Sequence, residues 1–158
     1  MPGHVVNRKD YDSRESFTEA LLGKLSELNA DLIVLAGFLY ILSPAFVERY
    51  ENRIINIHPA LIPSFCGDGF YGLKVHEKAL EYGGKLTGAT VHGGSAEADA
   101  GPSILQKAVP IEEGDTAEIL QKRVMEQAEW KLLPEAVSLF CQGRLHVEGR
   151  IVRIDQAE

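Results

Sequence analysis

The stretch Asp31-Leu-Ile-Val-Leu-Ala36, followed by Arg53-Ile-Ile-Asn-Ile57, decides the fold class of this chain. Both segments are continuous apolar runs of strand length with many β-branched residues, which is typical of strands covered on both faces of a sheet. Between them, Ser43-Pro44 offers an N-cap and a first-turn proline, so Ala45 to Tyr50 is predicted to be a short helix. A strand, a helix and a second strand in this order predict an α/β fold with a mainly parallel sheet.

The flanking sequence continues the alternation of helices and strands. Upstream, apolar residues recur at helical spacing from Ser13 to Leu28, which predicts an amphipathic helix. Downstream, Val75 to Tyr82 is predicted to be a helix that Gly83-Gly84 ends, and strands are predicted over Lys85 to His92 and Ile104 to Val109. The intervening loops run from His58 to Gly72 and from Gly93 to Pro102, and their length indicates function.

The last third of the chain is predicted to hold a long helix and a hairpin. Asp115-Thr-Ala-Glu118 has capping-box spacing, so a helix should begin there and continue through Ala128 toward Cys141, with Pro134 as a site for a kink. Two short β-type runs around Glu148-Gly149 predict a hairpin. In such a fold, ligands bind beyond the carboxyl ends of the strands, which selects the loops after Ala36, Ile57 and His92.

Composition and charge narrow the class of function. The 158 residues suit one domain, and the formal net charge of −7 without any long Lys or Arg run disfavours a nucleic-acid or anionic-membrane surface. The two cysteines, Cys66 and Cys141, lie far apart, and no secretory segment follows Met1, which predicts a reducing cytoplasm. No apolar stretch is long enough to span a bilayer. The sequence allows a homodimer but does not determine the oligomeric state.

The segment Asn56-Ile-His58-Pro59 is the strongest chemical signal in the sequence. Because side chains alternate along a strand, Asn56 and His58 should lie on the same face. An amide N–H and an imidazolium directed at one point are suited to stabilise a developing oxyanion. Asp99, in Asp99-Ala-Gly-Pro102 on the next long loop, is the carboxylate expected to keep His58 charged. A structural role for each of these residues remains an alternative.

These motifs resemble the signature of the 10-formyltetrahydrofolate-dependent formyltransferases. The resemblance rests on Asn56-Ile-His-Pro59, Gly88-x-x-x-His92 and Asp99-x-Gly-Pro102, which occur in order. Within this family, Ala36-Gly-Phe38, Ile41-Leu-Ser-Pro44 and Arg123-Val124 resemble the members that act on phosphoribosylglycinamide, the glycinamide ribonucleotide of purine biosynthesis. The resemblance implies a three-layer Rossmann-like formyltransferase fold over residues 1–158, one domain that is incomplete at its N-terminus relative to the family.

The resemblance also implies an activity and its residues. A formyl group would pass from 10-formyltetrahydrofolate, a co-substrate, to the amine of phosphoribosylglycinamide, with both partners small molecules and without a metal. His58 would be the catalytic acid, Asn56 would polarise the formyl oxygen, and Asp99 would raise the pKa of His58. The folate would contact Arg14, Leu39, Tyr40, Ile41, Leu42, Asn56 and the loop from Gly93 to Ala98, and the ribonucleotide would contact Pro59 and Glu129.

Several features depart from the family or leave alternatives. Nothing before His4 corresponds to the glycine-rich turn that holds the substrate phosphate in the family, so a non-catalytic remnant of the fold is one alternative. A 10-formyltetrahydrofolate hydrolase is the second, although Pro59 favours the transferase. Gly93-Gly94 replaces a more apolar pair and predicts a looser folate loop. The spacing of His58, His76 and His92 does not fit a zinc site.

Overall fold

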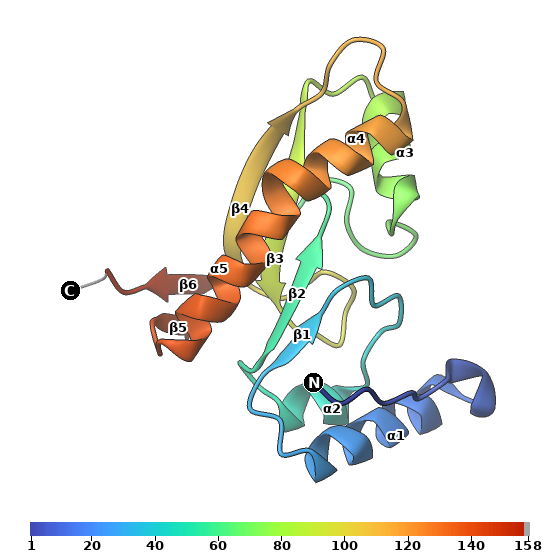
Figure 1. The fold of residues 1–158 in the computed structure, drawn as a ribbon, viewed down its shortest axis with the longest axis vertical. Coiled ribbons are helices and arrows are strands. Elements are labelled where there is room, and N and C mark those ends of the chain that lie inside the picture. Colours follow the sequence, from blue (N-terminus) through green and yellow to red (C-terminus); the bar gives the residue numbers. More distant parts are fainter. Residues whose placement is uncertain (157–158) are drawn as a thin grey trace.

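Strands β1 (Ile33–Leu35) and β2 (Ile54–His58) form the parallel pair that the sequence predicts (Figure 1). The computed structural model describes residues 1–156. The helices are η1 (Arg8–Asp10), α1 (Arg14–Glu27), α2 (Pro44–Arg49), α3 (Leu73–Glu81), α4 (Ala117–Val124), the π-helical turn η2 (Met125–Glu129) and α5 (Trp130–Cys141), and the remaining strands are β3 (Leu86–Gly93), β4 (Ser103–Pro110), β5 (Leu145–Glu148) and β6 (Ile151–Ile154).

The central sheet has the order β1-β2-β3-β4 among the described residues. Within residues 1–156, β1 and β2 are the one parallel pair of this sheet, and β2 with β3 and β3 with β4 pair antiparallel. The expected parallel arrangement is therefore found in the first pair of the described sheet. The reason is the position of α3, which lies beside α4 at one end of the sheet instead of crossing a sheet face (Figure 1). The chain therefore re-enters the sheet at the end where β2 left it.

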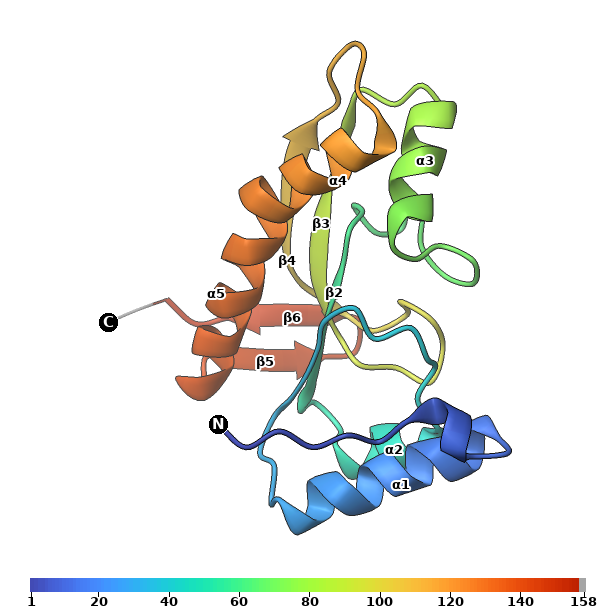
Figure 2. The same ribbon diagram turned by 45° about the vertical axis from the view of Figure 1, so that its right-hand side comes forward.

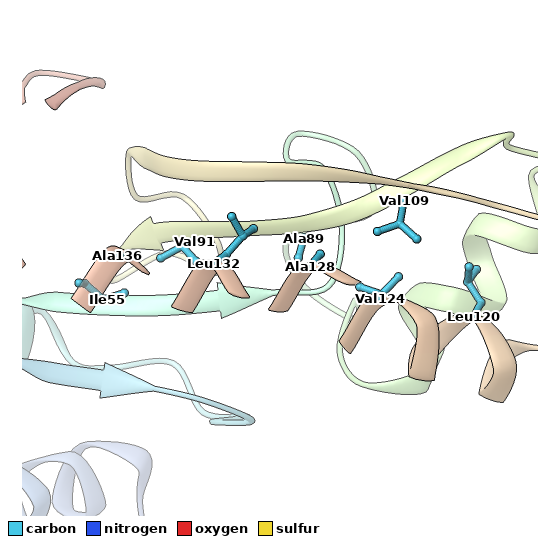
Figure 3. Close-up of a cluster of buried hydrophobic side chains, with 9 residues drawn as sticks. All are labelled: Ile55, Ala89, Val91, Val109, Leu120, Val124, Ala128, Leu132 and Ala136. Atoms are coloured by element: carbon cyan, nitrogen blue, oxygen red, sulfur yellow. The ribbon is translucent and has the colours of Figure 1, made fainter. Parts of the chain in front are cut away.

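One face of the sheet is covered by the continuous helical segment α4-η2-α5 (Figure 3). Its buried side chains recur every four residues and pack against β2, β3 and β4. A regular α-helix advances about 100° per residue, so each step of four residues drifts by about 40° around the axis. The π-helical turn removes part of this drift and keeps the stripe on the sheet. The stripe comprises Leu120, Val124, Ala128, Leu132 and Ala136, which contact Ile55, Ala89, Val91 and Val109.

The long helix predicted from the capping signal is thus confirmed, with a difference at its centre. Thr116 is the N-cap and accepts a hydrogen bond from the N–H of Ile119. Asp115 instead forms a bidentate ion pair with Arg123. The irregular turn lies at Met125–Glu129, before Pro134, which sits inside α5.

Helices α1 and α2 cover the opposite face at β1 and at the start of β2, which gives a helix, sheet and helix layering (Figure 2). Ile33 and Ile54 lie in this second core with Phe46 of α2. The predicted cap at Ser43 is formed, because its hydroxyl accepts from the N–H of Phe46. At the start of α1, the hydroxyl of Ser13 accepts from the N–H of Ser16. These two helices leave the carboxyl end of β2 uncovered.

The predicted hairpin is also present, as the antiparallel pair β5 and β6. It packs beside β4, and its tip reaches the loop after β3 through Arg150, whose guanidinium donates to the carbonyl of Ala100 at 2.8 Å. Within residues 1–156, no helix is long and apolar enough to cross a membrane.

Candidate active site

His58 is the last residue of β2, and only 4% of its surface is exposed. Its Nε2 lies 2.8 Å from the carbonyl oxygen of Phe65, which belongs to the loop that follows β2. A carbonyl only accepts hydrogen bonds, so Nε2 carries a proton. The other ring nitrogen, Nδ1, lies 3.4 Å from Oδ2 of Asp99 and carries a proton only when the ring is charged.

Asp99 reaches His58 by a route that the sequence does not indicate. Because β3 runs antiparallel to β2, the loop after β3 begins beside Ile55, at the amino end of β2. The loop then turns back along the sheet face, and Asp99 adopts a left-handed conformation with φ of 52°. Its Oδ2 also accepts a hydrogen bond from the N–H of Gly67 at 3.0 Å, which joins the two long loops.

The base of this loop is held by close backbone packing. The N–H of Gly93 donates to the carbonyl of Pro102 at 2.9 Å, and the N–H of Gly94 donates to the carbonyl of Ile54 at 3.0 Å. A Cβ atom at Gly94 would meet the side chain of Ile54, and one at Gly101 would collide with the carbonyl of Gly93. The pair Gly93-Gly94 was expected to loosen the loop, but Gly94 instead allows the loop to pack closely against Ile54 of β2.

Burial and charge act in opposite directions on the two titrating groups. Burial lowers the pKa of His58 below its usual value, and the Phe65 carbonyl and the Asp99 carboxylate only partly oppose this effect. Burial would raise the pKa of Asp99, but the nearby ring of His92, the hydrogen bond from the N–H of Gly67 and the charge of His58 hold it below its usual value. Asp99 thus acts upward on the pKa of His58, while the net shift of this pKa is downward because burial dominates.

Asn56 lies on the same face of β2 as His58, two residues earlier, and opposite His92 on β3. Within the part of the chain that the structure describes, no hydrogen bond occupies its side-chain amide, and the residue lines the cavity that contains His58. Its N–H donors are therefore free for a ligand. The alternation argument that placed Asn56 and His58 together is confirmed.

A cavity of 780 Å³ lies beyond the carboxyl ends of β1 and β2, within the usual range for small-molecule sites. It brings together most of the residues singled out in the sequence. Arg14 does not line it; this residue begins α1, one turn before Phe17, whose ring contacts Tyr40 at the cavity. The lining includes Leu39, Tyr40, Ile41, Leu42, Asn56, His58, Pro59, Gly94, Ser95, Glu97, Ala98, Asp99 and Glu129.

Glu129 enters the cavity from the last residue of the π-helical turn. Burial raises the pKa of its carboxyl. The π turn places Glu129 toward the cavity while Ala128 and Leu132 remain in the core. Such turns occur often at functional sites.

Sequence reasoning missed the polar network that supports the loop after His58. The buried hydroxyl of Thr90, opposite His58 in the sheet, donates to the carbonyl of Ala60 at 2.7 Å and accepts from the N–H of Ile62 at 3.1 Å. The amide of Gln106 donates both to Thr90 and to the carbonyl of Ile62. The sequence did contain one signal for this network: Thr90 and His92 are two residues apart on one strand, so both polar side chains lie on the same face of the sheet.

Among residues 1–156, no group of three or more His, Cys, Asp or Glu side chains is arranged to hold a metal ion.

Comparisons with known proteins show which family the chain is similar to. The family described as formyl transferase matches residues 1–137. The chain is 43% identical over 153 residues to the trifunctional purine biosynthetic protein adenosine-3 of Bos taurus, covering 96% of this chain and 15% of that protein. It is 39% identical over 152 residues to the phosphoribosylglycinamide formyltransferase of Escherichia coli, covering 96% of this chain and 69% of that one.

A solved structure gives the same result. The glycinamide ribonucleotide transformylase 1 of Symbiobacterium toebii superposes with a TM-score of 0.86 at 44% identity, covering 94% of this chain and 67% of that chain. The α/β, Rossmann-like architecture is therefore shared with solved transformylases. The chain spans 15% of the length of the bovine relative and about two thirds of the length of these bacterial enzymes. By its family match and its identity to these proteins, the chain belongs to the formyl transferase family.

Proposed function

We propose that this protein transfers the formyl group of 10-formyltetrahydrofolate to the amine of 5-phosphoribosylglycinamide, a step of purine biosynthesis. The observation that carries the proposal is the convergence of Asn56, His58 and Asp99 at one cavity beyond the carboxyl ends of β1 and β2. We infer the acceptor from the names of the relatives, and formyl transfer from the name of the family. We further propose that residues 1–158 act as one domain in the cytoplasm.

The proposed reaction needs an oxyanion to be stabilised. The amine nitrogen attacks the formyl carbon, a new C–N bond forms, and the carbonyl oxygen gains negative charge. The free amide of Asn56 and Nδ1–H of charged His58 lie on the same face of β2 and supply two donors. Donors fixed before the reaction do not have to reorganise during it, which is why such sites lower the barrier strongly.

The next step needs a proton on the leaving nitrogen. The bond between the formyl carbon and N10 of the folate breaks, the proton lost by the attacking amine is balanced by protonation of N10, and formylated product and tetrahydrofolate result. Nδ1 is the nitrogen of His58 that can donate, because Nε2 is held by Phe65. The 3.4 Å separation from Asp99 exceeds the usual length of a charged hydrogen bond, which leaves Nδ1 able to serve a ligand oxygen.

The cavity offers different surfaces to the two substrates. The segment from Leu39 to Leu42 and the loop residues Gly94 to Ala98 give an apolar and backbone-rich surface suited to the pterin ring. Glu129 and Pro59 lie on the lining as well, and a carboxylate is suited to accept hydrogen bonds from ribose hydroxyls. Arg14, outside the lining, is proposed to meet the extended part of the folate.

One assay tests the proposal. The purified chain is incubated with labelled 10-formyltetrahydrofolate, with and without phosphoribosylglycinamide, and the labelled products are identified. We expect loss of the formyl label only when the amine is present, together with labelled formylglycinamide ribonucleotide. The same measurement on His58→Ala separates catalysis by this site from a contaminating enzyme.

The alternatives give other results. Loss of formyl label without the amine would indicate a hydrolase. Absence of turnover, with a melting temperature that still rises when folate is added, would indicate a binding remnant. Either outcome would reject formyl transfer by this chain.

A further inference from the structure

His92 is a buried histidine on β3 that the proposed reaction does not use. Only 2% of its surface is exposed. Its Nδ1 lies 2.8 Å from the carbonyl oxygen of Gly93, and its Nε2 lies 3.4 Å from Oδ1 of Asp99. Asp99 therefore lies between two histidine rings, with Oδ2 toward His58 and Oδ1 toward His92.

The hydrogen-bond partners fix which nitrogen of each ring is always protonated. The carbonyls of Phe65 and Gly93 can only accept, so Nε2 of His58 and Nδ1 of His92 are both donors. The nitrogens that face Asp99 are then Nδ1 of His58 and Nε2 of His92. Each of these carries a proton only when its ring is an imidazolium.

His58, His92 and Asp99 form a cluster, and their arrangement limits how many protons this cluster holds. With both rings neutral, two nitrogen lone pairs face an ionised and mostly buried carboxylate, which is unfavourable. With both rings charged, two buried cations share one carboxylate, and each disfavours the other. A single proton shared between the two rings satisfies Asp99 with the least buried charge.

We propose that His92 is a positioning residue that shares with His58 the one proton stabilised by Asp99, and thereby sets the pH range in which His58 is charged. When His92 holds the proton, Asp99 is neutralised from its other side and Nδ1 of His58 has no proton to donate. When His58 holds the proton, it is the acid that the proposed reaction needs.

Two other titratable groups act on this cluster, and neither adds charge near neutral pH. Burial, followed by the charge of Asp99, raises the pKa of the Cys66 thiol. Burial, followed by the charge of His58, lowers the pKa of His76 to about 4. Neither Cys66 nor His76 therefore competes with His58 and His92 for the proton.

The test is a histidine NMR titration of the full chain between pH 5 and pH 9, compared with the variants His92→Gln and His92→Phe. Glutamine places an amide donor near the position of Nε2 without titrating, and phenylalanine removes both nitrogens. In both variants the competitor is lost, so we expect the apparent pKa of His58 to rise by about one unit and its titration to become a single step. The matched control is His146→Gln, an exposed histidine paired with Asp155, which should leave the His58 titration unchanged.

The inference rests on the proposed function for its meaning, but the titration itself needs no turnover. If transfer is measurable, the alkaline limb of the kcat profile should move to higher pH in His92→Gln, whereas a merely structural role would lower kcat without moving the profile. An unchanged or lowered His58 pKa in a folded variant would overturn the inference. If both variants fail to fold, the wild-type spectra decide: a His92 ring that keeps one protonation state while His58 titrates in one step would also overturn it.

Discussion

Nε2 of His58 donates a hydrogen bond to the carbonyl oxygen of Phe65, seven residues along the chain, with 2.8 Å between the nitrogen and the oxygen. This contact gives the loop after β2 a chemical role, since it fixes the ring orientation and leaves Nδ1 as the nitrogen that changes its protonation state. The Phe65 carbonyl is in turn placed by a loop that Thr90 and Gln106 hold to the sheet. The catalytic proposal therefore depends on the backbone of this loop as much as on the imidazole.

Removal of the imidazole tests this arrangement directly. In His58→Ala we expect turnover to fall by at least about a hundredfold, the lower range for loss of a general acid. Folate affinity should stay within a fewfold, because the apolar lining from Leu39 to Leu42 is unchanged. Steady-state kinetics and a fluorescence titration with a folate analogue measure the two effects. A decrease in turnover of less than tenfold would contradict the role of His58.

Replacement of Asn56 tests the second donor. In Asn56→Ala the loss of one oxyanion donor should raise the barrier by roughly 2.7–4 kcal/mol, seen as a decrease in kcat. In Asn56→Asp the side chain keeps its shape but brings a negative charge toward the oxyanion, so kcat should be at least as low. Stopped-flow measurement of the chemical step on both variants checks this order. A faster Asp variant than Ala variant would show that the amide does not face the reacting oxygen.

The stability of the fold should depend on pH through His76. This residue is 1% exposed, and burial lowers its pKa from 6.5 to about 4. Between pH 4 and pH 6.5 the unfolded chain binds more protons than the folded chain. The contribution of His76 to the free energy of unfolding is therefore fully present above pH 6.5 and is lost as the pH falls toward 4. The difference between the two pKa values corresponds to about 3 kcal/mol of this free energy. Urea unfolding at several pH values should show this slope in the wild type.

The matched comparison for this effect is between two histidine substitutions. His76→Leu should flatten the dependence of the unfolding free energy on pH between 6.5 and 4, whatever its effect at neutral pH. His146→Leu is the comparison variant, because it removes a histidine at an exposed position. Equal slopes in wild type and His76→Leu would show that another group causes the acid sensitivity.

Arg150 should influence the site from the tip of the β5–β6 hairpin. Its guanidinium donates to the carbonyl of Ala100, next to Asp99, and so restrains the loop that carries the carboxylate. In Arg150→Gln we expect kcat to fall about threefold to tenfold, the scale of one net hydrogen bond, with little change in melting temperature. Arg153→Gln is the control, because Arg153 lies on the same hairpin and pairs with the exposed Glu148. Equal kcat values for the two variants would exclude this restraint.

The sequence by itself determined most of the local structure, because caps, breakers and side-chain alternation act over a few residues. Ser43-Pro44 began α2 and Thr116 began the long helix, while Gly83-Gly84 followed α3, all close to the predicted positions. Alternation along β2 was sufficient to place Asn56 and His58 on one face. Asp99 was expected from its place on the next long loop, and family resemblance added the cavity-lining segment from Leu39 to Leu42.

Only the tertiary structure decided how these pieces meet. The antiparallel direction of β3 follows from the packing of α3 beside α4, and the π-helical turn follows from the need to keep an i, i+4 stripe on the sheet; neither has a short-range signature. The choice of the donating ring nitrogen in His58 and in His92 depends on the carbonyls of Phe65 and Gly93. Backbone groups are the same at every position of a sequence, so only folding selects which of them holds a given ring nitrogen.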